Sequence, residues 1–141
     1  MVTGWWKDTG QVEDMLEANR LILDVLEPRM DGQLVDSDIE GRVIVEQGAR
    51  LVNSHVRGPA VIGRDALIES SYIGPYSSIS TGCVVRRAEI EHSILLERVH
   101  LEDLDARVES SLIGRDVRIT RSDAKPKALR FVLGDSSVIG L

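Results

Sequence analysis

Residues 56–73 read VRGPAVIGRDALIESSYI, in which Val56, Ile62, Ile68 and Ile73 recur at steps of six, six and five. Neither an α-helix nor a flat strand produces this step. The same ladder of aliphatic residues continues on both sides of the stretch. It consists of Ile39, Val45, Leu51, Val56, Ile62, Ile68, Ile73, Ile79, Val85, Ile90, Leu95, Leu101, Val108, Ile113 and Ile119. The pattern predicts a chain that turns a corner every five or six residues and stacks on itself.

The repeat has three sides, because three steps of the ladder bring the chain back over itself after 17 or 18 residues. Val56, Ile73, Ile90 and Val108 have this spacing and are expected to stack. Fixed-period repetition of this kind marks a solenoid. We therefore predict a mainly β fold, a single-stranded left-handed parallel β-helix of the hexapeptide type with an N-terminal amphipathic α-helix. Left-handed winding is inferred from the short flat sides, against the usual right-handed crossover.

A second register supports this fold. Many ladder residues are followed four positions later by a small or compact side chain. These are Val43, Ala49, Ala66, Ser77, Cys83, Val99 and Val117. A narrow triangular tube explains both registers, because a large aliphatic fills each side and the corner has room only for a small residue. Glycine often follows the ladder residue directly, as at Gly63, Gly74 and Gly114, where we expect backbone angles that other residues avoid.

Length and composition indicate one soluble domain. The 141 residues are 28% charged and 43% hydrophobic, as in ordinary globular proteins. No apolar run approaches the ~20 residues that span a membrane, and no secretory signal opens the chain. Cys83 is the single cysteine, which excludes an internal disulfide and favours a reducing compartment. We expect a cytoplasmic protein without a membrane partner, in which Cys83 is a small core residue.

The charge argues against nucleic acid as a partner. The formal net charge is −6, whereas a duplex-binding surface needs a basic stripe. Arg86 and Arg87 form the one adjacent basic pair, and they lie beside Glu89 and Glu91. We interpret this pair as part of a solvated coil face.

An amphipathic helix is predicted before the ladder. Before the ladder, a set of residues recurs at spacings of three and four, and all but one of these residues are apolar. They are Val12, Met15, Leu16, Asn19, Ile22, Leu23 and Leu26. Pro28 ends the pattern. We expect this stripe to cover the open first coil, whose strand edges and core aliphatics would otherwise be exposed.

The patterns divide the chain into three segments. Residues 1–27 hold a motif loop and the helix, residues 28–38 read as a linker rich in Asp, Gly, Pro and Ser, and residues 39–141 form the solenoid. Near the end of the chain, Leu129, Phe131 and Leu133 alternate with other residues. We interpret this as one or two strands that close the C-terminal end, with Phe131 as a plug.

The first ten residues end in Trp5-Trp6-Lys7-Asp8-Thr9-Gly10 and belong to neither pattern. Two adjacent tryptophans are costly to expose. Asp8 precedes the helix by a turn, with Gln11 three residues later, which fits an N-cap. The alternative is a carboxylate presented to a divalent metal, since Mg²⁺ binds one or two carboxylates together with substrate phosphates.

At these residues the sequence resembles the long-form glucose-1-phosphate thymidylyltransferases, which are sugar-nucleotide pyrophosphorylases. The block WWKDTG followed by VEDMLEANRLILD looks like the end of their catalytic domain. Later stretches look like their C-terminal left-handed β-helix. They are VNS (52–54), RGP (57–59), IESSYIGPY (68–76) and IEHS (90–93). The likeness covers nearly the whole chain, and its most specific pieces are WWKDTG and IGPY.

The resemblance implies a site and a reaction. The family joins dTTP to a sugar 1-phosphate and releases pyrophosphate, with Mg²⁺ orienting the attack and neutralising charge. The aspartate of the matched motif is one of two that bind Mg²⁺, so Asp8 is the implied metal ligand, and Trp6 and Gly10 are implied to shape the sugar-phosphate side of the pocket.

The match is incomplete in an informative way. The family's catalytic domain opens with a glycine-rich basic loop that cradles the triphosphate, and no such run occurs in these 141 residues. One carboxylate leaves Mg²⁺ mostly hydrated. We therefore expect the chain alone to be inactive and to hold no cofactor. It would serve assembly or regulation beside the missing catalytic nucleotidyltransferase domain or a copy of itself.

Two other functions stay open. Many hexapeptide β-helix proteins transfer acyl groups from acetyl-CoA with a histidine as general base, and the candidates are His55, His92 and His100. The alternative without a catalytic role is a surface or corner histidine in each case. The chain also fits a purely structural module, because flat coil faces pack around symmetry axes into homo-oligomers such as trimers. Ser70-Ser71 and Ser110-Ser111 repeat within the scaffold, which argues against a serine nucleophile.

Overall fold

The computed structural model describes residues 10–121 and shows one helix followed by short strands. Helix α1 spans Gly10–Asp24. The strands are β1 (Arg29–Met30), β2 (Gln33–Val35), β3 (Asp38–Glu40), β4 (Val43–Val45), β5 (Arg50–Val52), β6 (His55–Arg57), β7 (Ala60–Ile62), β8 (Leu67–Glu69), β9 (Tyr72–Ile73), β10 (Ser77–Ile79), β11 (Val84–Arg86), β12 (Glu89–Glu91), β13 (Ile94–Leu95), β14 (His100–Glu102), β15 (Val108–Glu109), β16 (Leu112–Ile113) and β17 (Arg118–Thr120). Each strand is one side of a coil.

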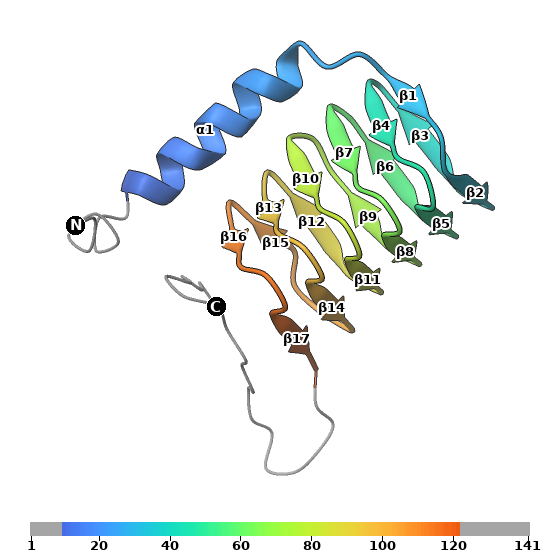
Figure 1. The fold of residues 1–141 in the computed structure, drawn as a ribbon. Helices are drawn as coiled ribbons and strands as arrows, with labels where there is room; N and C mark the ends of the chain where they lie inside the picture. The colour runs from blue at the N-terminus through green and yellow to red at the C-terminus, as the bar shows by residue number, and fades with distance from the viewer. Residues whose placement is uncertain (1–9, 122–141) are drawn as a thin grey trace.

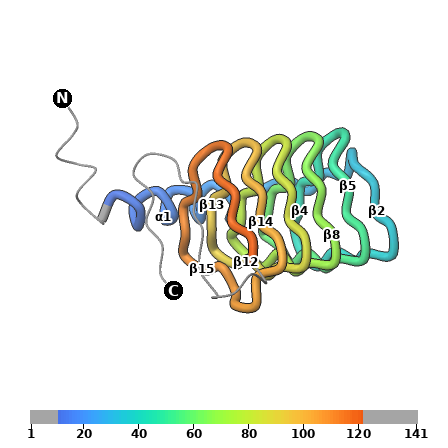
Figure 2. The backbone as a smooth tube through the Cα atoms, turned by 90° about the horizontal axis from the view of Figure 1, so that it is seen from below, coloured from blue at the N-terminus to red at the C-terminus, as the bar shows by residue number. Residues whose placement is uncertain are grey.

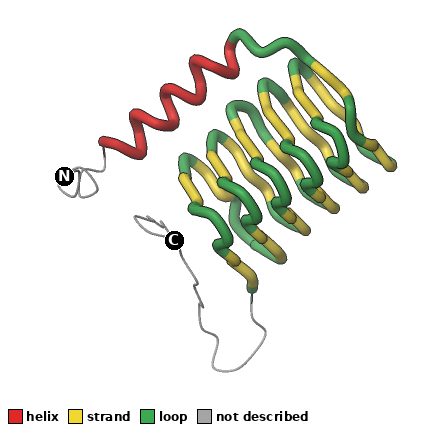
Figure 3. The backbone as a smooth tube through the Cα atoms, in the orientation of Figure 1, coloured by secondary structure: helices red, strands yellow, loops and turns green. Residues whose placement is uncertain are grey.

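The strands form three parallel sheets, one for each side of the stack (Figure 1). Sheet A has the order β1-β4-β7-β10-β13-β16, sheet B the order β17-β14-β11-β8-β5-β2, and sheet C the order β15-β12-β9-β6-β3. Each strand pairs with the strand three places later in the chain, which lies on the same side of the next coil. Figure 3 shows the short strands separated by corners throughout the stack. The predicted mainly β solenoid is confirmed.

The ladder residues fill the inside of the tube. In sheet B the register places Leu51, Ile68, Val85 and Leu101 above one another, and all four are fully buried. The second register is also confirmed, because every small residue that it named is buried. Fully burying a Val, Leu or Ile side chain contributes about 1.5–3 kcal/mol. Contacts between successive coils therefore stabilise the fold more than any single turn does.

The predicted backbone role of the glycines after the ladder is wrong. Gly63, Gly74 and Gly114 do not have positive φ, and the left-handed glycines of the described residues are Gly41, Gly48 and Gly82. Most corner positions with positive φ hold residues other than glycine. They are Asp36, Asn53, Asp65, Ser70, Tyr76, Arg87, His92, Arg98, Asp103, Ser110 and Asp116. Asp and Asn tolerate this region better than most residues, which explains their frequency at these corners.

Space between coils explains Gly63. A Cβ added to Gly63 would lie 2.7 Å from the carbonyl carbon of Ser80 and 2.8 Å from the carbonyl oxygen of Ile79. Both atoms belong to the backbone of the next coil, which cannot move without breaking the stack. Gly63 is therefore required by close packing rather than by its backbone angles.

Helix α1 lies along the outside of sheet A and runs opposite to the direction in which the coils advance (Figures 1 and 2). Leu16 and Leu23 are buried, and Asn19 between them contacts β10. The predicted stripe is thus correct in part, because Ile22 is 66% exposed and Met15 is 40% exposed. The prediction that the helix covers the open first coil is wrong. Polar contacts with β10 place the helix on a side face instead.

The first coil begins earlier than the sequence patterns suggested. Strands β1 and β2 lie within residues 28–38, which were assigned to a linker, and they pair with β4 and β5. Met30 and Leu34 take inward positions there but remain 46% and 41% exposed. Residues 129–133, the predicted closing strand, lie outside the described residues. No helix within residues 10–121 is long and apolar enough to cross a membrane.

Candidate functional site

A polar groove of about 580 Å³ runs along the corner between sheets B and C. Its floor consists of the small residues Ser54, Ser71 and Ala88, which occupy one position in successive coils. Polar side chains form the two walls, and Leu104 closes one end. The wall residues are Asp36, Asn53, Ser70 and Arg87 on one side and Asp38, His55, Tyr72 and Glu89 on the other. Leu104 belongs to the longer corner between β14 and β15, which protrudes from the stack in Figure 2.

The floor hydroxyls are occupied by the scaffold. The Ser71 hydroxyl donates to the carbonyl of Glu69 at 2.8 Å and accepts from the Ala88 amide at 3.2 Å. Ser54 repeats this arrangement one coil earlier and accepts from the Ser71 amide at 3.1 Å. Each hydroxyl thus joins two coils at the corner. The prediction that Ser70-Ser71 is a scaffold feature is supported by these contacts.

The sheet C wall is a row of interacting side chains. His55 Nδ1 lies 2.7 Å from Asp38 Oδ2, and the His55 ring stacks on Tyr72 with centroids 5.7 Å apart. The Arg107 guanidinium lies 5.1 Å from the centre of the same Tyr72 ring and is 2.8 Å from Glu89 Oε1. His55 is therefore held between a carboxylate and an aromatic ring, and the cation above Tyr72 adds a favourable cation–π contact.

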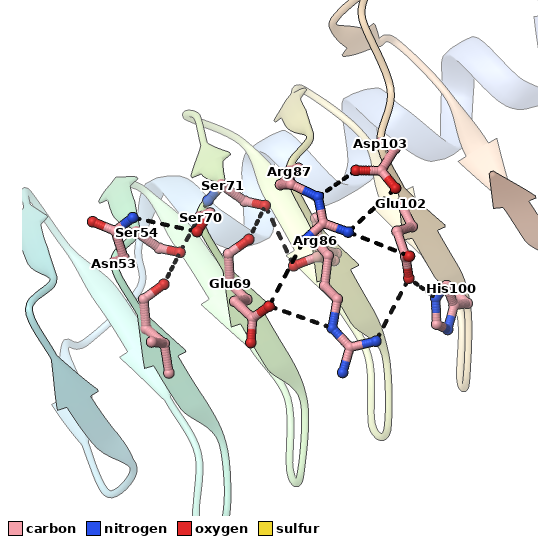
Figure 4. A network of polar contacts seen from close by, with 12 residues as sticks. Asn53, Ser54, Glu69, Ser70, Ser71, Arg86, Arg87, His100, Glu102 and Asp103 are labelled. Carbon is pink, nitrogen blue, oxygen red and sulfur yellow. Dashed lines mark hydrogen bonds and ion pairs between the residues drawn. The ribbon is translucent and has the colours of Figure 1, made fainter. Parts of the chain in front are cut away.

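The other side of the groove continues into an ion-pair network on sheet B (Figure 4). Arg86 lies 3.6 Å from Glu69 and 3.5 Å from Glu102, which also accepts from His100 at 2.8 Å. The hydrogen bond from His100 lowers the pKa of the Glu102 carboxyl. These groups are partly exposed, so the pairs align neighbouring coils without a large gain in stability.

Arg87 extends this network to the edge of the groove. Its guanidinium donates to both carboxylate oxygens of Asp103, and this hydrogen bonding lowers the pKa of Asp103. Arg87 is therefore already engaged by a carboxylate at the edge of the groove. The sequence interpretation of Arg86-Arg87 as a coil face agrees with these contacts.

The three candidate histidines lie in three different places. His55 is on the sheet C face, His100 is on the sheet B face, and His92 is at the corner between β12 and β13. His92 meets Tyr76 edge-on at 6.5 Å, and its Nε2 atom is buried with no hydrogen-bond partner. Within residues 10–121 no three His, Cys, Asp or Glu side chains are grouped to hold a metal ion. The fold therefore does not assemble the histidines into one centre.

The remaining predicted site residues lie at the start of the chain. Trp6 and Asp8 fall outside the described residues, and Gly10 is the first residue of α1. Cys83 is fully buried, and burial raises the pKa of its thiol. Its inward corner position agrees with the predicted packing role, since a raised pKa disfavours the reactive thiolate.

Sequence reasoning predicted contact between α1 and the solenoid but missed the polar contacts that place the helix on sheet A. The Ser78 hydroxyl donates to Asn19 Oδ1 at 2.7 Å, and the Tyr76 hydroxyl donates to Asp24 Oδ1 at 2.7 Å. The hydrogen bond to Asp24 raises the pKa of Tyr76. The signal was present in the sequence, because Asn19 is the single polar residue of the predicted apolar stripe. These four residues, Asn19, Asp24, Tyr76 and Ser78, are called the helix clasp below.

Parallel three-sided coils with inward aliphatics define the chain as a hexapeptide-type β-solenoid. A family model described as the GlmU-like C-terminal hexapeptide domain matches residues 73–129. The chain is 50% identical over 139 residues to a glucose-1-phosphate thymidylyltransferase of Streptomyces griseus, covering 97% of this chain and 39% of the relative. A glucose-1-phosphate thymidylyltransferase of Streptomyces antibioticus is 46% identical over 140 residues, covering 99% of this chain and 39% of the relative.

A third relative is more distant. A nucleotidyltransferase of low-salt glycan biosynthesis from Haloferax volcanii is 34% identical over 145 residues, covering 100% of this chain and 40% of the relative. The chain is thus similar over nearly its whole length to the C-terminal region of glucose-1-phosphate thymidylyltransferases, which confirms the resemblance seen at WWKDTG and IGPY. It spans 39% of the length of the two Streptomyces relatives.

Proposed function

We propose that this chain is the solenoid module of a glucose-1-phosphate thymidylyltransferase. A nucleotidyltransferase part preceding α1 would convert dTTP and a sugar 1-phosphate to a dTDP-sugar and pyrophosphate. The similarity to two such enzymes over nearly the whole chain supports this assignment. The module would hold α1 and the segment before it in place for that part.

The observation that carries the proposal is the second apolar face of α1. Met15, Leu21 and Ile22 of α1 are 40%, 58% and 66% exposed, and Val25 directly after the helix is 76% exposed, although another face of the helix is buried on sheet A. We call these four residues the outer stripe. Exposed apolar clusters of this kind mark interaction surfaces. The nucleotidyltransferase part is the proposed partner, because it would be joined directly to the start of this helix and so be present at high effective concentration.

The helix clasp fixes the outer stripe relative to the coils. Tyr76 belongs to the IGPY segment and binds Asp24, whereas WWKDTG leads into the other end of the helix. Tyr76 of the IGPY segment thus contacts the helix that directly follows WWKDTG in the sequence. In this arrangement the solenoid positions the segment that contains Asp8, without supplying chemistry of its own.

The described residues do not fit a Mg²⁺ site, because they contain no group of three suitable ligands. No step of the reaction is therefore assigned to them. The proposal keeps Asp8 as one carboxylate ligand of Mg²⁺ in the intact enzyme, with Trp6 and Gly10 beside the sugar phosphate. It also keeps the chain alone inactive, since one carboxylate does not hold Mg²⁺ tightly.

A chimaera tests the proposal. This chain would replace the matching C-terminal region of the Streptomyces griseus enzyme, and pyrophosphate release from dTTP and glucose 1-phosphate would be measured with Mg²⁺. We expect the chimaera to be active and the isolated chain to be inactive. Ile22→Asp with Val25→Asp in the chimaera should lower activity at least tenfold, because charge is placed in an apolar interface. Arg57→Asp, an exposed change on sheet C, should leave it unchanged. Turnover by the isolated chain, or an inactive chimaera with intact coils, contradicts the proposal.

A further inference from the structure

The outer edge of the first coil is open, and it exposes residues that take inward positions in the stack. By register Met30 lies over Val45 and Leu34 lies over Leu51, and both of these partners are fully buried. Met30 and Leu34 themselves are 46% and 41% exposed. Ile39, the third inward residue of this coil, is only partly buried. The three inward residues thus form an apolar triangle that helix α1 leaves uncovered.

The backbone of the same three residues also points to the open edge. Gln33 donates to Ala49 at 2.9 Å, and Asn53 donates to Val35 at 2.9 Å, so the residues that flank Leu34 pair with the second coil. Asp38 and Glu40 flank Ile39 in the same way, through Ser54 and Gly58. Neighbouring residues of a strand direct their amide groups to opposite edges. Among the described residues β1, β2 and β3 are the terminal strands of their sheets, so these amide groups face outward.

We propose that this edge binds the same edge of a second copy across a two-fold axis through β2. The outline to be matched is a triangle of strands two or three residues long, and an identical coil has that outline. The axis places Leu34 opposite Leu34 of the second copy, and Met30 opposite its Ile39. Each facing pair exchanges both backbone hydrogen bonds in antiparallel geometry. Exposed sheet edges pair readily in this way.

The side chains beside the inward residues bring both an attraction and a repulsion to this contact. With Met30 opposite Ile39 of the second copy, Arg29 faces Glu40 of that copy, and the symmetry repeats this attraction. Asp31 faces Asp38, and these two carboxylates repel each other, although Arg29 of the same chain lies 2.7 Å from Asp31 and reduces this repulsion. A two-fold contact is closed, so assembly stops at a dimer. A head-to-tail contact between first and last coils would instead continue into a filament.

Cross-linking tests the axis directly. Antiparallel residues that exchange both hydrogen bonds have Cα atoms roughly 5.5 Å apart, within the range for a disulfide. Leu34→Cys should therefore form a covalent dimer on mild oxidation of the chain 1–141. Val52→Cys, one coil further in on the same sheet, should not. Cys83 is buried and does not compete. A monomeric Leu34→Cys chain after oxidation overturns the proposal.

Sedimentation of the whole chain over a range of concentrations gives the second test. The unaltered chain should reach a dimer and stop. Leu34→Asp should yield monomer, whereas Val52→Asp should not. Arg29→Glu should raise the dissociation constant about tenfold, because two symmetry-related attractions become repulsions, and Arg29→Glu with Glu40→Arg should restore it.

Each other outcome of the sedimentation test contradicts the proposed contact through the edge of the first coil. A monomer at all concentrations means that another part of the chain covers the first coil. A trimer or a growing filament means a different contact. A dimer that Ile22→Asp dissociates and Leu34→Asp does not means assembly through the outer stripe. These results concern the isolated chain, so they are independent of whether the chimaera has activity.

Discussion

The Ser78 hydroxyl, on the outer face of β10, donates a 2.7 Å hydrogen bond to Asn19 Oδ1 in the middle of the buried face of α1. The amide of Asn19 also donates to the Tyr76 carbonyl at 3.4 Å. The flanking helix residues Leu16 and Leu23 are buried. One polar pair inside an apolar contact fixes where along the stack the helix lies, because sliding by one coil would leave both groups unpaired.

Ser78→Ala is expected to weaken the clasp. It removes the closest hydrogen-bond partner of the Asn19 side chain, and an unpaired buried polar group costs about 1–3 kcal/mol. Hydrogen exchange of the α1 amides should become faster, while exchange in the coils changes little. Asn19→Leu with Ser78→Val should recover much of the loss, since both partners are then apolar. Thr81→Ala, at an exposed corner, is the control. Unchanged exchange in α1 after Ser78→Ala shows that the pair does not hold the helix.

The space around two glycines predicts a difference between them. Gly63→Ala should lower the free energy of unfolding by about 1–3 kcal/mol, because the added methyl group overlaps the backbone of Ile79 and Ser80. Gly74→Ala should cost less. Its nearest neighbours are the side chains of Glu91 and Tyr72 at 3.1 Å, and these can move. Denaturant unfolding measures both variants. Equal losses contradict the spatial explanation for Gly63.

The serine column of the groove floor should contribute to coil stacking. Ser71→Ala removes the acceptor of the Ala88 amide and the bond to the Glu69 carbonyl. The loss should be about 1–3 kcal/mol, because a buried amide is left without this partner. Ser110→Ala, on an exposed corner, should change stability by less than roughly 0.5 kcal/mol. Thermal and denaturant unfolding give both values. An unchanged free energy of unfolding in Ser71→Ala would contradict a structural role for the hydroxyl.

Acid should weaken the solenoid through carboxylates paired with arginine. Arg87 lowers the pKa of Asp103, and Arg98 lowers that of Asp116, from an ordinary value of 3.8. A lowered folded pKa means that the stabilisation is present above the ordinary value and is lost as the pH falls through the folded value. Unfolding free energy should therefore be level between about pH 7 and pH 5 and fall below about pH 4.

Variants at the arginines test the source of this acid dependence. Arg87→Gln and Arg98→Gln together should make the fall below about pH 4 shallower, because the carboxylates then return toward their ordinary pKa. Arg57→Gln is the matched control, since Arg57 has no ion pair among the described residues. An unchanged acid profile in the double variant assigns the loss to other carboxylates.

The period of the sequence was sufficient to predict the coils. An aliphatic residue every five or six positions is incompatible with a helix or a flat strand, so Ile62, Ile68 and Ile73 had few alternatives to stacking inside a three-sided tube. The small residues at the corners followed from the same narrow interior. Local pattern and burial coincide here because each coil repeats the environment of the one before it.

The position of α1, the start of the first coil and the composition of the groove depended on contacts between distant residues. The helix has apolar residues on two faces, and periodicity cannot say which face meets the solenoid. Asn19 and Ser78, 59 residues apart, decide it. Gly63 shows the same limit, because its need for space arises from a coil that lies one turn further along the chain. The sequence alone determined the repeating tube, since the repeat is local. Tertiary structure alone decided what lies beside the tube and which edge stays open, since those choices rest on single long-range contacts that no period encodes.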